Sequence, residues 1–167
     1  IDAAMTSDLS KIKNTRSKKK FTISLAESCT GGMISKYLTS TNGSSLFFNG
    51  ACISYSNQMK TRLLNVPKNT IINYGAVSHQ TALAMVKGLK AITDSEILLS
   101  VTGVAGPSGG TARTPVGCVF FGIGSKINKK YTFKTTKKIF HEKTRLAIQK
   151  KSTEYAMYLI LKELKKI

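Results

Sequence analysis

The densest group of reactive side chains in the sequence is the stretch Glu-Ser-Cys-Thr-Gly-Gly at 27–32, which follows an apolar run beginning at Phe21. A connection needs only a turn residue or a helix cap, whereas this one carries an acid, two hydroxyl groups and a thiol. A helical pattern resumes from Gly31, so free backbone N–H groups and the positive end of the helix would favour an anion here. Ser28 and Thr30 could instead be simple N-caps. The stretch is no Walker A loop, because the spaced Gly-Lys-Ser/Thr ending is missing.

A nucleophile in this stretch would need a base. Cys29 could attack as a thiolate, but no histidine lies in the motif to activate it, so we interpret it as a structural thiol. A serine such as Ser28 can use a neutral lysine in place of histidine. Lys60 ends the stretch Tyr-Ser-Asn-Gln-Met-Lys that follows the next strand-rich segment. Taken alone, Lys60 is one of 22 lysines and is more typical of a solvated surface.

A second unusual segment is the Gly-, Pro- and Thr-rich loop at 103–115. Loops of this length are uncommon in compact domains unless they have a function. Like the stretch at 27–32, it directly follows an apolar, strand-like run, here at 95–103. Ligands of open α/β sheets bind beyond the carboxyl ends of the strands. We therefore expect the two segments to form two walls of one pocket.

The elements that would position these segments alternate between strand and helix patterns, which is typical of an α/β domain. We predict a three-layer α/β/α sandwich with a mostly parallel, mixed sheet and helices on both faces. Residues 1–20 are expected to form an N-terminal helical and basic segment, and 21–167 a single domain. The expected elements are a helix from Ser7 to about Thr15, a strand at 21–26, a helix from Gly31, a strand-rich segment at 46–56, a short helix ending before Pro67, a helix capped by Ser78 with Ala82, Met85, Val86 and Leu89 on its apolar face, a strand at 95–103, a hairpin of 116–124 and 129–136, and a last helix with Ala156, Leu159, Ile160 and Leu164 as its inner stripe.

Composition limits the classes of function. No run reaches the ~18 apolar residues of a membrane span, so no membrane partner is expected. The three cysteines are far apart, which suggests reduced thiols and a cytoplasmic protein. Two isolated histidines and the lack of a CxxC pair argue against a metal site, and no cofactor is expected. The net charge of +18 comes from lysine far more than arginine and is interpreted as solvated basic faces, although a nucleic-acid-binding protein stays open and would show steep salt dependence.

Five motifs in this order and spacing, AESCTGG, YSNQMK, YGAVS, VTGVAGPSGGT and PVG, resemble the CinA C-terminal domain family. The proteins of this family are bacterial nicotinamide-nucleotide amidases, also described as competence/damage-inducible proteins. The resemblance runs from about Phe21 to the C-terminus. It implies hydrolysis of nicotinamide mononucleotide to nicotinic acid mononucleotide and ammonia, in pyridine nucleotide recycling, by a Ser/Lys pair without metal. The family's serine matches Ser28, its lysine Lys60, and a tyrosine near the site matches Tyr55.

The resemblance also implies a nucleotide-binding set and a homo-oligomeric assembly. Two departures lie among the implied binding positions: Arg145 stands in Glu-Lys-Thr-Arg rather than Gly-Asp-Arg, and Thr114 replaces a lysine, with Arg113 beside it. A non-catalytic nucleotide-binding module is therefore the alternative. The implied substrate-binding residues are Glu27, Thr30, Gly31, Gly32, Thr102, Gly103, Ala105, Gly106, Gly109, Gly110 and Arg145.

The proposed chemistry sets two further expectations. Lys60 must be neutral to act as a base, and lowering a lysine pKa from about 10.4 to about 7.5 takes roughly 4 kcal/mol against the charged form. An ionised Glu27 beside Lys60 would oppose this shift, so we expect Glu27 to point away, toward ribose hydroxyls or backbone N–H groups. The sequence begins at Ile1, which indicates a missing initiator or a fragment, and the family's stand-alone form, without the N-terminal domain of its larger members, is the closer match.

Overall fold

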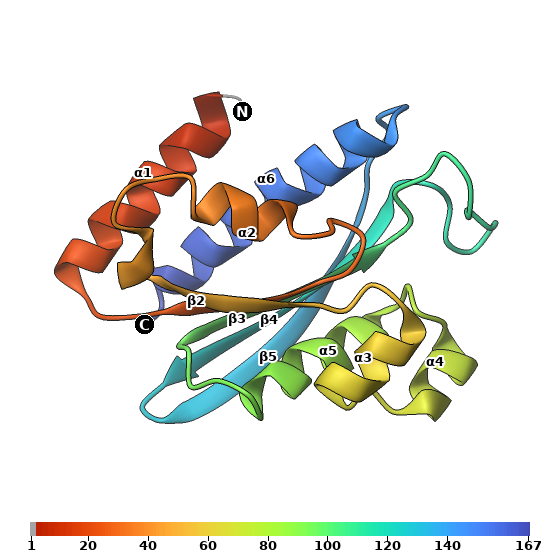
Figure 1. Cartoon of the computed structure of the whole chain (residues 1–167), viewed down its shortest axis with the longest axis horizontal. Helices are drawn as coiled ribbons and strands as arrows, with labels where there is room; N and C mark the ends of the chain where they lie inside the picture. Colours follow the sequence, from red (N-terminus) through yellow and green to blue (C-terminus); the bar gives the residue numbers. More distant parts are fainter. Residues whose placement is uncertain (1–2) are drawn as a thin grey trace.

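The computed structural model describes residues 3–167, and the first two residues of the predicted 1–20 segment lie outside the described part. Its centre is a five-stranded sheet of order β2-β1-β3-β4-β5 (Figure 1). β1 pairs in parallel with β2 and β3, whereas β4 is antiparallel to both β3 and β5. Four strands therefore run one way and β4 alone runs the other. The strands are β1 (Ile23–Glu27), β2 (Phe48–Ile53), β3 (Ile97–Gly103), β4 (Cys118–Ile127) and β5 (Lys130–Ile139).

Helices cover both faces of this sheet, as Figure 1 shows. One layer contains α1 (Ala3–Lys18), α2 (Met33–Leu38) and α6 (Arg145–Leu164), and α1 packs along α6. The other contains α3 (Asn57–Leu64), α4 (Lys68–Tyr74) and α5 (His79–Lys90), with α5 against β3 and β4. A 3-10 turn, η1 (Ser44–Leu46), precedes β2. The predicted three-layer α/β/α sandwich with a mixed sheet is confirmed.

Local signals account for the clearest elements. Ser78 caps α5, where its Oγ accepts a hydrogen bond from the Thr81 N–H at 3.1 Å. The four apolar residues predicted for the inner face of α5 and the four predicted for α6 are all buried. Asn128 and Lys129 both have positive φ (52° and 67°), the backbone geometry that two-residue hairpins favour, and the antiparallel β4–β5 hairpin is confirmed.

The N-terminal helix is longer than predicted, because α1 extends to both sides of the expected 7–15. Met5, Leu9 and Ile12 lie at helical spacing, are buried, and belong to the main core together with residues of α6. The segment 1–20 is thus packed onto the rest of the fold over the part that the structure describes.

Two boundaries differ from expectation. β1 starts two residues later than predicted and includes Glu27, so the acid belongs to the strand rather than to the turn. α4 was not predicted at all: it begins directly after Pro67, and none of its residues is buried. Ile71 alone among the apolar residues of α4 packs against the core, so α4 leaves no periodic signal in the sequence.

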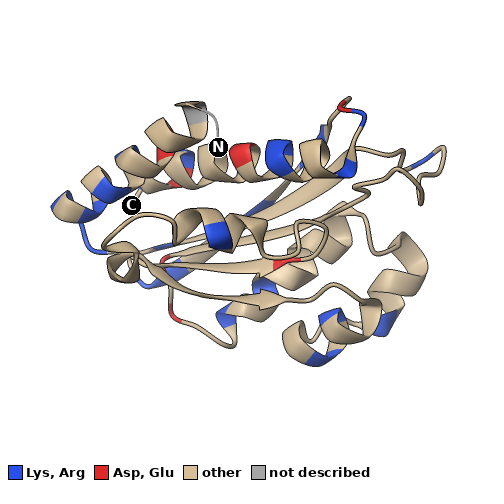
Figure 2. Ribbon diagram, turned by 45° about the horizontal axis from the view of Figure 1, so that its top comes forward, with Lys and Arg blue, Asp and Glu red and all other residues tan. Residues whose placement is uncertain are grey.

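Basic residues are spread over both helical layers (Figure 2). Among residues 3–167, no helix is long and apolar enough to cross a membrane.

Candidate active site

The end of β1 is fixed on both sides before the chain turns. The Ser28 N–H donates to the Val101 carbonyl of β3 at 3.1 Å, and the Ser54 N–H donates to the Glu27 carbonyl at 2.9 Å. Ser28 is therefore held as an extension of the sheet between its two parallel neighbours, at their carboxyl ends. Its side chain is largely buried.

Lys60 reaches Ser28 from α3, on the other side of the sheet from α2. Ser56 caps α3 by accepting the Met59 N–H at 3.0 Å, which sets the start of the helix one turn before Lys60. Lys60 is 2% exposed. Its Nζ lies 3.0 Å from Ser28 Oγ and 2.8 Å from the Tyr55 carbonyl oxygen, and the Ser28 hydroxyl lies 3.3 Å from that same carbonyl. The predicted proximity of Ser28 and Lys60 is confirmed.

This contact suits proton exchange. A charged lysine has only donors, whereas neutral lysine has a lone pair and keeps two N–H groups. A neutral Lys60 can therefore donate to the Tyr55 carbonyl while accepting the hydroxyl proton of Ser28. The Tyr55 carbonyl holds both side chains, so the backbone of Tyr55 organises the pair.

Burial is the main electrostatic influence on Lys60 and lowers the pKa of its ammonium group. An ionised Cys29 would raise it. Burial, however, raises the pKa of the Cys29 thiol to about 12, with the Glu27 charge adding to the rise and the charges of Lys60 and Arg145 opposing it. Cys29 is therefore un-ionised near neutral pH, and its opposing effect on Lys60 vanishes there. This also fits the interpretation of Cys29 as a structural thiol.

Glu27 is turned away from Lys60, as expected. Its carboxylate is fully buried and accepts four hydrogen bonds: from Thr30 Oγ1 (2.6 Å), the Ile34 N–H (3.0 Å), and the N–H and Oγ of Ser35 (2.9 and 2.5 Å). These bonds satisfy free donors at the start of α2 and tie the turn to the strand. The acceptor capacity of Glu27 is used within the chain, and the structure gives it and the Thr30 hydroxyl a scaffolding position instead of one facing a ligand.

The glycine pair shapes this turn. Gly31 and Gly32 have φ of 58° and 104°, values that side-chain-bearing residues rarely adopt. A Cβ on Gly31 would meet nothing within 4 Å, and one on Gly32 would make only an ordinary contact with Ile53. The glycines thus serve the backbone conformation and not a close approach to a neighbouring group. The Gly31 N–H donates to the Ser28 carbonyl at 3.0 Å, so it is not one of the free N–H groups expected to favour an anion here.

The Gly-rich loop after β3 forms the second wall. Both of its ends are pinned, since the Val104 N–H donates to the Cys118 carbonyl (2.9 Å) and the Gly117 N–H to the Val104 carbonyl (2.7 Å). Close packing requires glycine at Gly106, where a Cβ would lie 2.4 Å from Val116 Cγ1. At the base of the loop, the buried Thr102 hydroxyl donates to the Ala76 carbonyl at 2.8 Å and ties the loop to the segment before α5.

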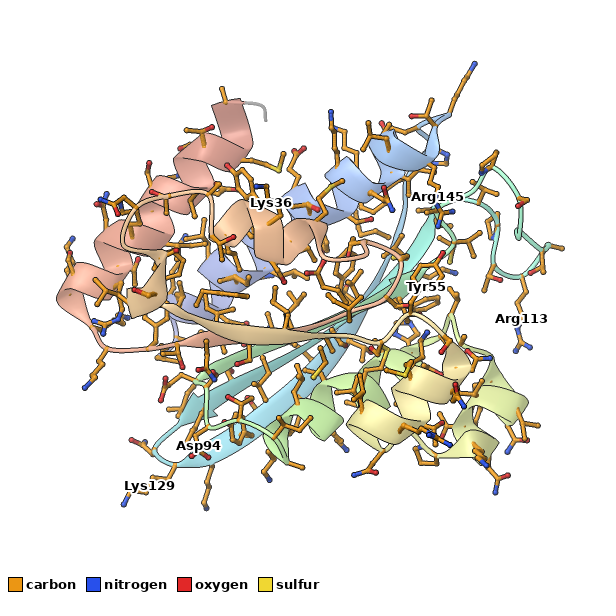
Figure 3. All side chains as sticks on the ribbon, in the orientation of Figure 1. Lys36, Tyr55, Asp94, Arg113, Lys129 and Arg145 are labelled. Carbon is orange, nitrogen blue, oxygen red and sulfur yellow. The ribbon has the colours of Figure 1, made fainter. Side chains whose placement is uncertain are left out.

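Arg145 connects the two walls. It is the first residue of α6, after Thr144, whose Oγ1 accepts the Ala147 N–H. Its guanidinium donates to the Gly106 carbonyl and to the Tyr55 hydroxyl, both at 2.7 Å, and Figure 3 shows Tyr55 and Arg145 close together. A cation at a helix N-terminus is electrostatically unfavourable, so an anionic ligand would relieve this arrangement.

One turn further along α6, Gln149 donates from Nε2 to the Cys29 carbonyl at 3.0 Å. Sequence reasoning missed this residue. Its only signal is the spacing of four from Arg145, which places both side chains on one face of the helix.

These residues enclose a pocket of about 290 Å³, near the lower end of the range for ligand sites. Two of its lining residues, Lys60 and Arg145, are basic, and none of the described residues that line it is Asp or Glu. The predicted residues that line it are Ser28, Tyr55, Lys60, Thr102, Gly103, Ala105, Gly106, Gly109 and Arg145; those that do not are Glu27, Thr30, Gly31, Gly32 and Gly110; the unpredicted lining residues are Cys29, Asn57, Ala76, Val77, Val104 and Ser108.

The two departures from the family motifs, at Thr114 and in the residues before Arg145, lie in different parts of the structure. Thr114 is bonded within the loop, through its N–H to Thr111 Oγ1 at 3.0 Å and its carbonyl to the Thr111 N–H at 2.9 Å. Arg113 projects from the loop away from Arg145 (Figure 3). Arg145 lines the pocket, whereas Arg113 and Thr114 do not. Within residues 3–167 there is no cluster of three or more His, Cys, Asp or Glu side chains that could hold a metal ion.

Comparisons with known proteins agree on one family. The model of the CinA C-terminal domain matches residues 6–164. A CinA-like protein of Pseudothermotoga lettingae is 41% identical over 145 residues, covering 87% of this chain and 34% of the relative. One of Dictyoglomus thermophilum is 51% identical over 107 residues, covering 64% of this chain and 26% of the relative. The chain thus spans about a third of the length of the curated relatives it matches.

Two solved structures match this fold over nearly their whole length. The competence/damage-inducible protein CihA from Agrobacterium tumefaciens superposes with a TM-score of 0.91 at 30% identity, covering 99% of this chain and 98% of that one. A CinA superfamily protein from Klebsiella pneumoniae gives a TM-score of 0.87 at 23% identity, covering 98% and 99%, and shows the shared fold. With the family model matching almost the entire sequence, the chain belongs to the CinA C-terminal domain family.

Proposed function

We propose that this chain is an amidohydrolase that converts nicotinamide mononucleotide to nicotinic acid mononucleotide and ammonia, and so recycles pyridine nucleotides. The observation that carries the proposal is the 3.0 Å contact between Ser28 Oγ and the Nζ of a lysine that is only 2% exposed. A surface lysine is held charged by water, whereas burial favours the neutral form that a general base needs.

In the first half-reaction, Ser28 Oγ attacks the carboxamide carbon while Lys60 takes the hydroxyl proton. The C–N bond then breaks, and Lys60 returns the proton to the departing ammonia. The negative charge on the carboxamide oxygen needs donors that are already in place, each worth about 2.7–4 kcal/mol in the transition state. We assign this role to the peptide N–H groups of the 29–32 turn other than that of Gly31, which is already bonded.

In the second half-reaction, water attacks the acyl ester on Ser28. Lys60 takes a proton from the water and passes it to Ser28 Oγ as the ester bond breaks, which releases the carboxylic acid. One lysine thus serves as base and acid in turn, so its pKa must lie near the working pH.

Arg145 is the proposed contact for the 5′-phosphate. A guanidinium has five N–H donors, and here two nitrogens each make one bond within the chain, to Gly106 and Tyr55. The remaining N–H groups can donate to phosphate oxygens in a charge-assisted pair. Tyr55 then acts through its carbonyl on the Ser28/Lys60 pair and through its hydroxyl on Arg145.

Ammonia release on adding nicotinamide mononucleotide tests the proposal, with Ser28→Ala as the matched control. Ammonia from the wild type and none from the variant supports the amidase. Binding of the nucleotide without ammonia release would reject the amidase in favour of the non-catalytic nucleotide-binding module. The homo-oligomeric state and cytoplasmic location expected from the sequence are also proposals, and a solution mass measurement tests the first.

A further inference from the structure

The pocket has an unusual charge balance for a site proposed to bind a pyridinium ring, which is itself a cation. Its basic lining residues are Lys60 and Arg145, and among the described residues that line it there is no acid to pair with them. The nearest buried acid in the sequence, Glu27, has its four acceptor contacts satisfied by Thr30, Ile34 and Ser35. Such a pocket favours an anionic group next to Lys60.

The proposed reaction generates an anion at that position. In the second half-reaction, the attacking water gives its proton to Lys60, so the oxygen that it adds to the acyl carbon forms beside Nζ. The product is first a neutral carboxylic acid next to a neutral amine. A carboxylic acid has a pKa near 4, far below that of an amine. The acid therefore loses its proton to Lys60, and the final state is an ammonium–carboxylate pair with no net change in protons.

We propose that the pocket is a proton-linked carboxylate site, which binds the acid product together with one proton on Lys60, whereas the amide substrate binds without that proton. This inference rests on the proposed function. It follows that the released acid inhibits the enzyme, and that rising pH relieves the inhibition.

The surroundings of Lys60 leave it as the group that takes the proton. The titratable or charged groups that line the pocket with it are Cys29 from the turn after β1, Tyr55 from the segment between β2 and α3, and Arg145 from α6. The Cys29 pKa of about 12 keeps that thiol protonated near neutrality, and a guanidinium stays charged. The lining residues from the segment before α5 and from the loop after β3 are not titratable.

The direction of the pH effect follows from linkage. Burial lowers the Lys60 pKa in the free protein, and a bound carboxylate raises it again. Below the free-protein pKa, Lys60 is already charged and binding takes up no proton. Between the free and bound pKa values, binding takes up close to one proton, and affinity for the acid falls about tenfold per pH unit.

The test is calorimetric titration with nicotinic acid mononucleotide across about pH 7–10, a range chosen to lie above the phosphate pKa near 6. Repeating each titration in two buffers of different ionisation enthalpy gives the number of protons taken up. We expect uptake to rise toward one proton with pH in the wild type and in Lys36→Met, whose lysine is exposed on α2. Uptake and pH-dependent affinity should both be lost in Lys60→Met. Nicotinamide mononucleotide bound to Ser28→Ala, which carries the same phosphate but no carboxylate, should show no uptake.

The outcomes separate this inference from the function on which it rests. No uptake by the wild type, unchanged uptake in Lys60→Met, or no binding of the acid would each overturn it. Ammonia release without proton-linked binding would leave the amidase standing and remove the inference. Proton-linked binding without ammonia release would keep the carboxylate site and remove the amidase.

Discussion

Replacing Lys60 tests the proposed mechanism most directly, because two substitutions separate its possible roles. Lys60→Met keeps the length of the side chain and removes the titrating group. Lys60→Arg keeps a positive charge but cannot release a proton near neutral pH. A general base predicts that both variants fail, whereas a lysine that only supplies charge predicts that arginine partly rescues.

The structure sets the expected size of these effects. Lys60 Nζ makes its contacts to Ser28 Oγ and to the Tyr55 carbonyl, and loss of general-base catalysis lowers kcat by about 10²–10⁴, equivalent to roughly 3–5 kcal/mol. Folding should change less, within about 2 kcal/mol, because the lost hydrogen bonds are offset by removing a buried amine. Arginine must also fit a longer, planar group into a site that leaves lysine 2% exposed.

The pH dependence adds a second check. Wild-type activity should rise with pH through a pKa below the ~10.4 of free lysine, because burial lowers the Lys60 pKa. Stability should follow in the same direction. The folded state carries a penalty for a charged, buried lysine below the folded pKa, and that penalty disappears as pH rises toward the unfolded pKa. Lys60→Met does not carry this penalty. The difference in free energy of unfolding between Lys60→Met and the wild type should therefore shrink as the pH rises from the folded toward the unfolded pKa.

Steady-state ammonia release across about pH 6–10 measures all three proteins, with the exposed Lys36→Met as the control for loss of one charge. Substantial activity in Lys60→Arg would refute the general-base role. So would an unchanged rising limb in Lys60→Met, since the titrating group would then lie elsewhere.

Three other substitutions probe the parts of the site separately. Ser28→Ala should abolish ammonia release yet bind the nucleotide within about threefold of wild type, because the serine acts mainly in the transition state; a large loss of affinity by calorimetry would contradict this. Arg145→Ala should weaken nucleotide binding by about 1.5–3 kcal/mol, whereas Arg113→Ala, in the loop after β3 and outside the pocket lining, should not; equal effects would remove Arg145 as the phosphate contact. Glu27→Gln should lower the free energy of unfolding by about 2–4 kcal/mol in urea denaturation. The four donors around Glu27 now bond to carboxylate oxygens, and the NH₂ group of glutamine would face some of them donor to donor. A change under about 0.5 kcal/mol would reject the capping role.

The sequence predicted those parts of the fold whose signals are local. The helix capped by Ser78 and the hairpin around 128–129 depend on residues within one turn of each other, and both are confirmed. α4 was not predicted, because a short helix with no buried residue shows no hydrophobic periodicity in the sequence. The start of β1 was misplaced by two residues for a related reason, since an apolar run does not show where strand pairing begins.

The site was harder to predict, because its contacts are long-range. Ser28 and Lys60 are 32 residues apart, and Arg145 lies 90 residues from Tyr55. Only the resemblance to a family brought them together in advance. Glu27 was difficult for another reason. An acid beside a nucleophile suggests a ligand contact, but Glu27 accepts hydrogen bonds from the backbone N–H groups at 34 and 35, which become available only when α2 forms. Gln149, which holds the Cys29 carbonyl, belongs to no motif at all.

The reversed direction of β4 has a consequence for how this fold can diversify. A parallel connection must cross the sheet and would commit its residues to a covering helix. Because β3 and β4 are antiparallel, the segment between them leaves and re-enters the sheet at the same edge, pinned at Val104 and Gly117. Insertions or deletions between these pins would change the outer wall of the pocket without shifting strand register or the Ser28/Lys60 pair. The loop is thus an interchangeable module, through which related proteins could acquire new ligand preferences while keeping one reactive centre.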